Sequence, residues 1–255
     1  MAQERRHRSR PRRRRGRFSG LYKLLSILLV TAAVIIACVV FFRVNHVTVT
    51  GNSRYTAQEI IDASGIEVGD NLIALAKGRI ANRILPALPY VRAVNIQRVF
   101  PDGVLLTVTE HLASAAVSDG RNWWYISAQG KLLEESSRSG PMRVTGLEAV
   151  EPQAGGKLTV EEEQQSRLNY VLKLLAVLEE RGDLANCSAL DCSETGVLWL
   201  DYLNFRIKMP TTGDFDYIMN TLDTIFDEDG RVTREDSGTF DFTITEGKAY
   251  YSASS

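Results

Sequence analysis

The residues best suited to chemistry in this chain form two short acidic runs near its carboxyl end. The first is Asp214-Phe215-Asp216 and the second is Asp227-Glu228-Asp229-Gly230, with Asp236 shortly after it. Closely spaced carboxylates are typical of EF-hand calcium loops and of metal-dependent glycosyltransferases. An EF-hand loop here would place Ile225 at the first ligand position, where an oxygen ligand is required. We therefore interpret the second run as a solvated acidic turn, and keep a glycosyltransferase as the alternative function.

Other residue types that catalyse reactions or bind metals are few and unsuitably spaced. The histidines are His7, His46 and His111, and no pair of them has metal-ligand spacing. The sequence contains no Gly-x-Ser-x-Gly, no His-Glu-x-x-His and no glycine-rich phosphate loop. These motifs therefore predict no catalytic site, and we expect no cofactor or metal.

Two further groups have both a functional and a structural interpretation. Cys187 and Cys192 could form a disulfide only if a turn at 188–190 brought their Cα atoms within about 7 Å, and buried free thiols are the alternative. Trp123, Trp124 and Tyr125 could line a ligand surface, but their strand-like spacing favours a place in the core.

The first fifty residues place the rest of the chain relative to a membrane. Residues 24–42 are nineteen residues without a charge, about 28 Å of helix, close to the roughly 30 Å thickness of a hydrocarbon core. A cleaved signal peptide would have a shorter apolar stretch and small residues at its exit, whereas residues 37–43 are mostly bulky. The pattern predicts an uncleaved transmembrane helix over residues 21–43.

Basic residues on the two sides of this helix predict its orientation. The preceding segment carries nine arginines, against the lone Arg43 on the other side. Short flanks rich in Arg and Lys stay in the cytoplasm, so residues 1–20 are expected to be a disordered cytoplasmic tail and the following domains to lie outside. Attraction to anionic lipid explains the cluster without a nucleic acid, which we do not expect as a partner. The arginines expected to set the orientation are Arg12, Arg13, Arg14, Arg15 and Arg17.

The first outer segment, residues 44–112, has the pattern of a small β-α-α-β-β domain. Alternating valines, a capping box and a Pro-Asp-Gly hairpin turn each mark one of its elements. The expected elements begin with a strand from Val44 and a short helix opened by Thr56 and Glu59 and ended near Gly65. A second helix is expected to start after Asn71 and to stop before Pro86, with Ile73, Ala76, Ile80 and Ile84 on its inner side. Strands at 91–99 and 104–110 follow, with Val94, Ile96, Val104 and Leu106 packed beneath the helices.

The second outer segment, residues 113–246, predicts a mixed α/β sheet domain, and residues 247–255 a carboxyl-terminal tail. Gly, Ser and Pro between 136 and 157 indicate turns. Beyond them we expect a helix capped by Thr159 and Glu162 and ended at Gly182, with Leu168, Leu172, Leu175 and Leu178 on one side. Strands are expected at 189–192, 197–200 and 205–209, followed by a helix at 215–226. In the final strand Phe240, Phe242 and Ile244 are expected to face the core.

Three stretches of this sequence carry a recognisable pattern: PYVRAVNIQRVFPDGVLLTVTE at 89–110, WYISAQGKLL at 124–133 and PMRVTGL at 141–147. They resemble the FtsQ/DivIB family of cell-division proteins. The corresponding family patterns are Pro-x-Val-x-x-Ala-x-Val-x-Arg-x-x-Pro with a strand that ends in Val-x-Glu, Tyr-x-Ile-Asp-x-x-Gly-x-Val-Leu, and Pro-x-x-x-x-Gly-Leu. Ser127, His111, Ala113 and Met209-Pro210 depart from the common pattern.

The resemblance implies a fold, a function and partners. The fold is α+β: a cytoplasmic tail, one transmembrane helix, a β-α-α-β-β POTRA domain and a mixed α/β sheet domain. The function is that of a non-enzymatic scaffold of the bacterial division machinery at the outer face of the cytoplasmic membrane, at the septum. Its partners are bitopic coiled-coil proteins of the FtsL and FtsB/DivIC type and, through them, the septal peptidoglycan synthase. A type II membrane glycosyltransferase or other cell-wall enzyme is the alternative, as is a POTRA-bearing secretion or outer-membrane assembly factor, although no series of barrel strands follows here.

The main partner surface is expected on the final strand, residues 240–245, with Tyr250 and Tyr251 near its rim. A strand at the end of a chain often lies at a sheet edge, whose unpaired backbone groups an extended partner segment can complete. Thr243, Thr245 and the two tyrosines would then touch the partner. The resemblance also implies docking at the last strands, and a frayed tail at Tyr250 and Tyr251 is the alternative.

Overall fold

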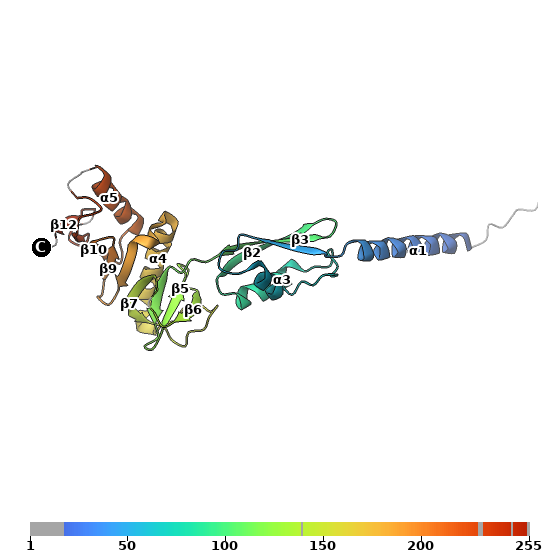
Figure 1. Cartoon of the computed structure of the whole chain (residues 1–255), viewed down its shortest axis with the longest axis horizontal. Helices are drawn as coiled ribbons and strands as arrows, with labels where there is room; N and C mark the ends of the chain where they lie inside the picture. The colour runs from blue at the N-terminus through green and yellow to red at the C-terminus, as the bar shows by residue number, and fades with distance from the viewer. Residues whose placement is uncertain (1–17, 139, 229–231, 246, 254–255) are drawn as a thin grey trace, which may run out of the picture. The chain divides into compact units, whose positions relative to one another are not determined.

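A computed structural model describes residues 18–138, 140–228, 232–245 and 247–253 (Figure 1). The orienting arginines, Arg12 to Arg15 and Arg17, lie outside these residues, as do Asp229 and Gly230 of the second acidic run. The chain divides into two compact units. The first, which we call the anchor unit, contains the amino-terminal helix with Glu67–Leu75 and Arg98–Val104, and the second contains the remaining elements.

The amino-terminal helix α1 spans Phe18–Phe41. Its stretch Gly20–Phe41 is the one helix in the described part of the chain that is long and apolar enough to cross a membrane, and none of that stretch is buried inside the protein. A helix that is apolar on all sides and is not buried in protein is suited to a lipid bilayer. α1 therefore fits a single-pass membrane anchor.

The first outer domain has the predicted element order. It consists of β1 (His46–Thr50), α2 (Ala57–Ser64), α3 (Lys77–Ala87), β2 (Val91–Val99) and β3 (Gly103–Glu110), and its sheet has the order β1-β3-β2. The capping box of α2 is confirmed, because the Thr56 hydroxyl accepts from the Glu59 amide and the Glu59 carboxylate accepts from the Thr56 amide. Gly65 ends this helix with a φ of 63°. Ile96, Val104 and Leu106 are buried and Val94 half-buried, as expected.

The second helix of this domain starts later than predicted. Its expected start just after Asn71 is wrong, because the Asn71 side chain accepts hydrogen bonds from the amides of Ile73 and Ala74 and so forms a turn, and α3 begins at Lys77. Ile73 is therefore outside the helix and 46% exposed. Pro86, expected beyond the helix, lies inside its last turn. Ile80 and Ile84 are buried as predicted.

The second outer domain is built on a mixed sheet. In the described part of the chain this sheet has nine strands in the order β12-β11-β10-β9-β8-β7-β4-β5-β6. The pairs β4–β7, β7–β8 and β10–β11 are parallel and the other paired neighbours are antiparallel. The strands are β4 (Ala115–Ser118), β5 (Trp123–Ile126), β6 (Leu132–Ser136), β7 (Met142–Glu148), β8 (Cys187–Asp191), β9 (Val197–Tyr202), β10 (Phe205–Pro210), β11 (Gly238–Asp241) and β12 (Tyr250–Ala253).

Strand β7 overturns the prediction that residues 136–157 form only turns. Met142, Val144 and Leu147 are buried, and β7 lies between β4 and β8 in the middle of the sheet. Gly146 adopts a φ of 87°, and a Cβ there would lie 2.5 Å from the Ser193 amide nitrogen. The glycine that suggested a turn is thus required by a close approach of neighbouring backbone inside the sheet.

Two helices, α4 (Gln165–Arg181) and α5 (Phe215–Glu228), join the strands in one hydrophobic core (Figure 1). Gly182 ends α4 with a φ of 76°, as predicted. The predicted cap at Thr159 is wrong, since its hydroxyl donates to the Val150 carbonyl at 2.8 Å and a 3-10 turn at Glu162–Gln164 precedes α4. Arg181 at the end of α4 forms ion pairs with Asp216 and Asp223 of α5, which ties the two helices together.

Candidate functional site

The acidic runs that suggested metal chemistry serve local structure where they are described. The Asp214 carboxylate accepts from the Tyr217 amide at 3.2 Å and so caps α5, and Asp216 lies 3.4 Å from the Arg181 guanidinium. Asp236 accepts from the amide and hydroxyl of Thr233, which lowers the pKa of its carboxyl group. No cluster of His, Cys, Asp or Glu that could hold a metal ion occurs among the described residues.

The two outer cysteines are free thiols. Cys187 begins β8 and Cys192 follows its end, and the five residue steps between them span about 16 Å of extended strand, beyond the reach of a disulfide. The Cys187 thiol lies 3.4 Å from the Asp183 carbonyl and the Cys192 thiol 3.0 Å from the Thr145 carbonyl. Burial raises the pKa of Cys187 to about 12 and that of Cys192 to about 11, so neither is a reactive thiolate at neutral pH.

The aromatic run on β5 also has a structural role. Trp124 is buried, and its indole N–H donates to the Asp119 carboxylate at 3.0 Å. Trp123 and Tyr125 are half-buried on the same strand. The core interpretation is confirmed for Trp124.

The predicted edge strand is wrong, because the chain continues past it and adds another strand. β11 ends at Asp241 and is paired on both sides, with β10 and with β12. The Asp241 carboxylate accepts from the amide of Thr243 at 2.7 Å and from its hydroxyl at 2.6 Å, which turns the chain away from the sheet. Phe240 and Phe242 are buried as predicted, but Ile244 is 61% exposed instead of facing the core.

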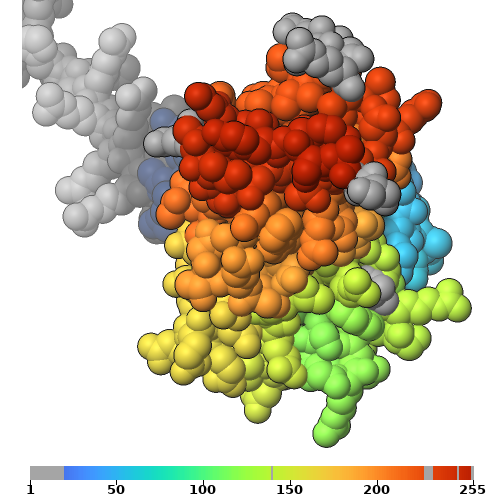
Figure 2. Space-filling view, turned by 90° about the vertical axis from the view of Figure 1, so that its left-hand side faces the viewer, coloured from blue at the N-terminus to red at the C-terminus, as the bar shows by residue number. Residues whose placement is uncertain are grey.

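One edge strand of the sheet is β12, which occupies part of the predicted tail at 247–255. Tyr251 pairs with Phe240 of β11, and their ring centroids are 5.0 Å apart. The Tyr251 hydroxyl donates to the Ser237 carbonyl at 3.1 Å, and the Tyr250 hydroxyl lies 3.0 Å from the Thr245 hydroxyl. All four residues of β12 are nevertheless exposed, and the carboxyl-terminal segment forms a red band of surface atoms in Figure 2.

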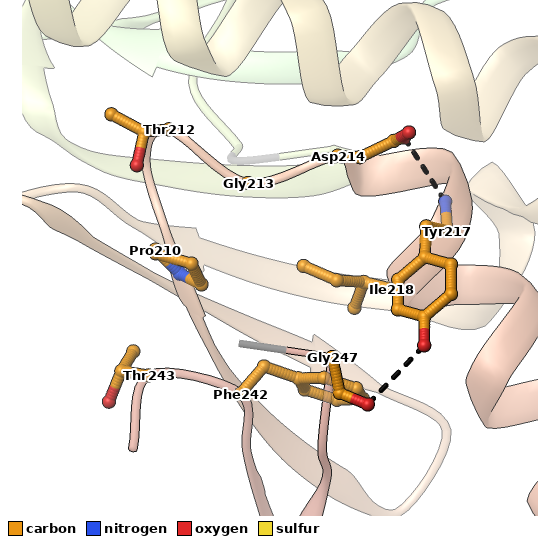
Figure 3. Close-up of a pocket in the computed structure, with 9 residues that line it drawn as sticks. All are labelled: Pro210, Thr212, Gly213, Asp214, Tyr217, Ile218, Phe242, Thr243 and Gly247. Carbon is orange, nitrogen blue, oxygen red and sulfur yellow. Dashed lines mark hydrogen bonds between the residues drawn. The ribbon is translucent and has the colours of Figure 1, made fainter. Parts of the chain in front are cut away.

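A cleft of about 690 Å³ lies beside the turn that leads into β12. In Figure 3 Pro210, Tyr217 and Phe242 line it from three separate segments, and the Tyr217 hydroxyl donates to the Gly247 carbonyl at 3.3 Å. Of the predicted partner-binding residues, Thr243 lines this cleft, Thr245 is exposed in the turn, and the two tyrosines lie on β12. The cleft was not predicted, although Tyr217, an exposed aromatic residue on the polar face of α5 and opposite its buried apolar residues, was a usable signal.

These features define a protein with one apolar amino-terminal helix, a β-α-α-β-β domain and a sheet domain with an open terminal strand. Comparison with known proteins agrees: residues 42–111 match the family model "POTRA domain, FtsQ-type". The cell division protein DivIB of Clostridium acetobutylicum is 24% identical over 68% of this chain and 69% of its own length. DivIB of Clostridium tetani is 22% identical over 71% of this chain and 68% of its own length. FtsQ of Streptomyces coelicolor is 30% identical over 45% of this chain and 42% of its own length. Residues 42–111 therefore match a POTRA domain of the FtsQ type, and over about two thirds of its length the chain is similar to cell division proteins named DivIB.

Proposed function

We propose that this division protein is a non-enzymatic, single-pass scaffold that holds partner proteins at the outer face of the cytoplasmic membrane at the septum. The observation that carries the proposal is the open edge at β12. Among the strands that the structure describes, β12 is paired on one side with β11 and ends the sheet on the other side, and all four of its residues are exposed.

An open strand edge favours a partner that supplies an extended segment. Unpaired backbone N–H and C=O groups of β12 can pair with such a segment, and side chains on the rim then add selectivity. Tyr250 and Tyr251 are 42% and 39% exposed, and aromatic residues often contribute much of the binding energy of an interface. Thr243 and Thr245, in the turn that precedes β12, remain part of this proposed surface.

The family resemblance supports specific partners for this edge. They are bitopic coiled-coil division proteins of the FtsL and FtsB/DivIC type, with the septal peptidoglycan synthase as an indirect partner. A cell-wall enzyme would instead need a catalytic group, whereas the carboxylates of Asp214, Asp216 and Asp236 serve a helix cap, an ion pair and a turn.

The experiment that tests this function is capture of membrane neighbours by the outer fragment, residues 44–255. The proposal predicts recovery of a small bitopic coiled-coil protein and no turnover of sugar nucleotides. Sugar-nucleotide hydrolysis or transfer by the purified fragment would instead establish the enzyme alternative.

A topology experiment tests the proposed orientation. A reporter that is active only outside the cytoplasm, fused after Ser255, is expected to be active, because arginines in short flanks stay in the cytoplasm. Replacing Arg12, Arg13, Arg14 and Arg15 with glutamate is expected to weaken insertion or reverse part of the population. An inactive fusion to the unaltered chain would contradict the orientation.

A further inference from the structure

The junction between α1 and the first outer domain is a folded contact within the anchor unit. The Asn71 side-chain amide donates to the Val39 carbonyl at 3.4 Å, and the Leu72 amide donates to the Phe42 carbonyl at 2.9 Å. The amides of Val44 and Gly69 donate to the carbonyls of Asp70 and Val44, each at 2.8 Å. The loop at 69–72 therefore satisfies carbonyl groups at the end of α1 that have no partner inside the helix.

This contact places the loop at the depth where α1 leaves the bilayer. Residues 24–42 span about 28 Å as a helix, which leaves Val39 and Phe42 at the outer end of the roughly 30 Å hydrocarbon core. Because unsatisfied backbone carbonyls are most costly in the hydrocarbon region, capping by the loop is most useful at this depth. The residues that neighbour the loop must then lie near the lipid headgroups.

The residues at this depth expose large apolar side chains. We call Val68, Ile73, Val99 and Phe100 the apolar collar, and they are 77%, 46%, 46% and 60% exposed. The collar adjoins the end of α1, because the Phe100 ring packs edge-on against Phe42, the residue that follows α1, with ring centroids 5.5 Å apart.

The collar is held in place by hydrogen bonds from Arg98. Its guanidinium donates to the carbonyl of Ile73 at 3.0 Å and to that of Leu75 at 2.7 Å, so the loop is fixed to the end of β2 beside Val99 and Phe100. Exposed large apolar side chains on a surface that hydrogen bonds hold in a fixed position indicate an interaction site.

We propose that the apolar collar is seated in the outer leaflet, where it contacts the lipid headgroups and the upper parts of the acyl chains. The inference rests on the proposed function only in that α1 spans the membrane. The collar is expected to contact lipid because it adjoins the end of α1, where the chain leaves the bilayer. Asp70 and Asp102 are ionisable neighbours of the collar, and the cost of burying their charge limits the collar to the interface. The first outer domain is thus held at the membrane by its own surface as well as by its covalent link to α1.

The test uses tryptophan fluorescence of the full chain in phosphatidylcholine vesicles whose acyl chains carry bromine, a contact quencher. The unaltered chain supplies the background from Trp123, Trp124 and Trp199. The emission added by Phe100→Trp is expected to be quenched, more strongly by bromine near the headgroup end of the acyl chain than by bromine near the terminal methyl. The emission added by Leu112→Trp, a similarly exposed apolar site outside the collar, is expected to be unquenched.

Two further variants make every outcome decisive. Val68→Trp places the probe on the most exposed collar residue and replaces Phe100→Trp if that variant loses the native circular dichroism. Val34→Trp, within α1, reports the anchor alone. Quenching of Val34→Trp without quenching of a folded collar variant would overturn the collar and leave the anchor intact. An unquenched Val34→Trp would overturn the membrane anchor and the collar together.

Discussion

Replacing Gly238 with alanine is expected to reduce partner capture by roughly a hundredfold, about 2.8 kcal/mol of binding free energy. A Cβ at Gly238 would lie 2.5 Å from the Ser252 carbonyl oxygen and 2.5 Å from the Tyr251 ring. The first of these atoms is backbone, so β12 must move away from β11. The variant displaces the proposed docking strand without changing any residue of that strand.

Gly78→Ala is the matched control for this prediction. A Cβ at Gly78 would meet no atom within 4 Å, and the residue lies in the first turn of α3. The measurement is the dissociation constant of each variant of fragment 44–255 for the captured coiled-coil protein, alongside its melting transition. Unchanged binding by a folded Gly238→Ala variant whose β12 amides have lost their protection from hydrogen exchange would move the docking surface away from this edge.

Replacing Ile96 with aspartate is expected to unfold the first outer domain. Ile96 is 4% exposed on β2, so the new carboxylate would be buried without a partner at a cost of about 3–5 kcal/mol. Domains of this size are stable by only about 5–10 kcal/mol, and an isolated one by less, so fragment 44–112 is expected to lose its cooperative melting transition.

The adjacent Asn95→Asp variant separates burial from charge. Asn95 is exposed on the opposite face of the same strand, because successive side chains alternate between faces. This variant is expected to melt within about 0.5 kcal/mol of the unaltered fragment. A fragment that tolerates Ile96→Asp as well as Asn95→Asp would show that Ile96 is not in the core of this domain.

Elements coded by nearby residues were predictable from the sequence, and elements that depend on distant strands were not. The capping box at Thr56 and Glu59 and the glycine at 182 act within one or two helical turns, so their patterns are local. β7 owes its place to parallel pairing with β4 and β8, and the latter begins about forty residues further on. Its short sequence, which is flanked by glycines, has the composition of a turn, and it becomes a strand because it pairs with a neighbouring strand on each side.

The candidate site was predicted in its general location but not in its geometry. Alternation over Phe240, Phe242 and Ile244 favoured one long strand, yet the hydrogen bonds from Thr243 to Asp241 end that strand early. β12 has only four residues and consists of tyrosine, serine and alanine, so its pattern is too short to distinguish a strand from a tail. Pairing of Tyr251 with Phe240 supplies the missing information, and it is visible only in three dimensions.

The most direct test of the scaffold proposal is site-specific photocrosslinking in living cells from Ser252, in the middle of β12. Ser252 is exposed and pairs with Thr239, so a photoreactive side chain there would lie against any segment added to this edge. We expect an adduct with a small bitopic coiled-coil division protein, and no such adduct from Glu135, at the opposite edge of the sheet on β6. An adduct formed from β6 or from the first outer domain, with none from Ser252, would contradict the proposal that β12 holds the partner.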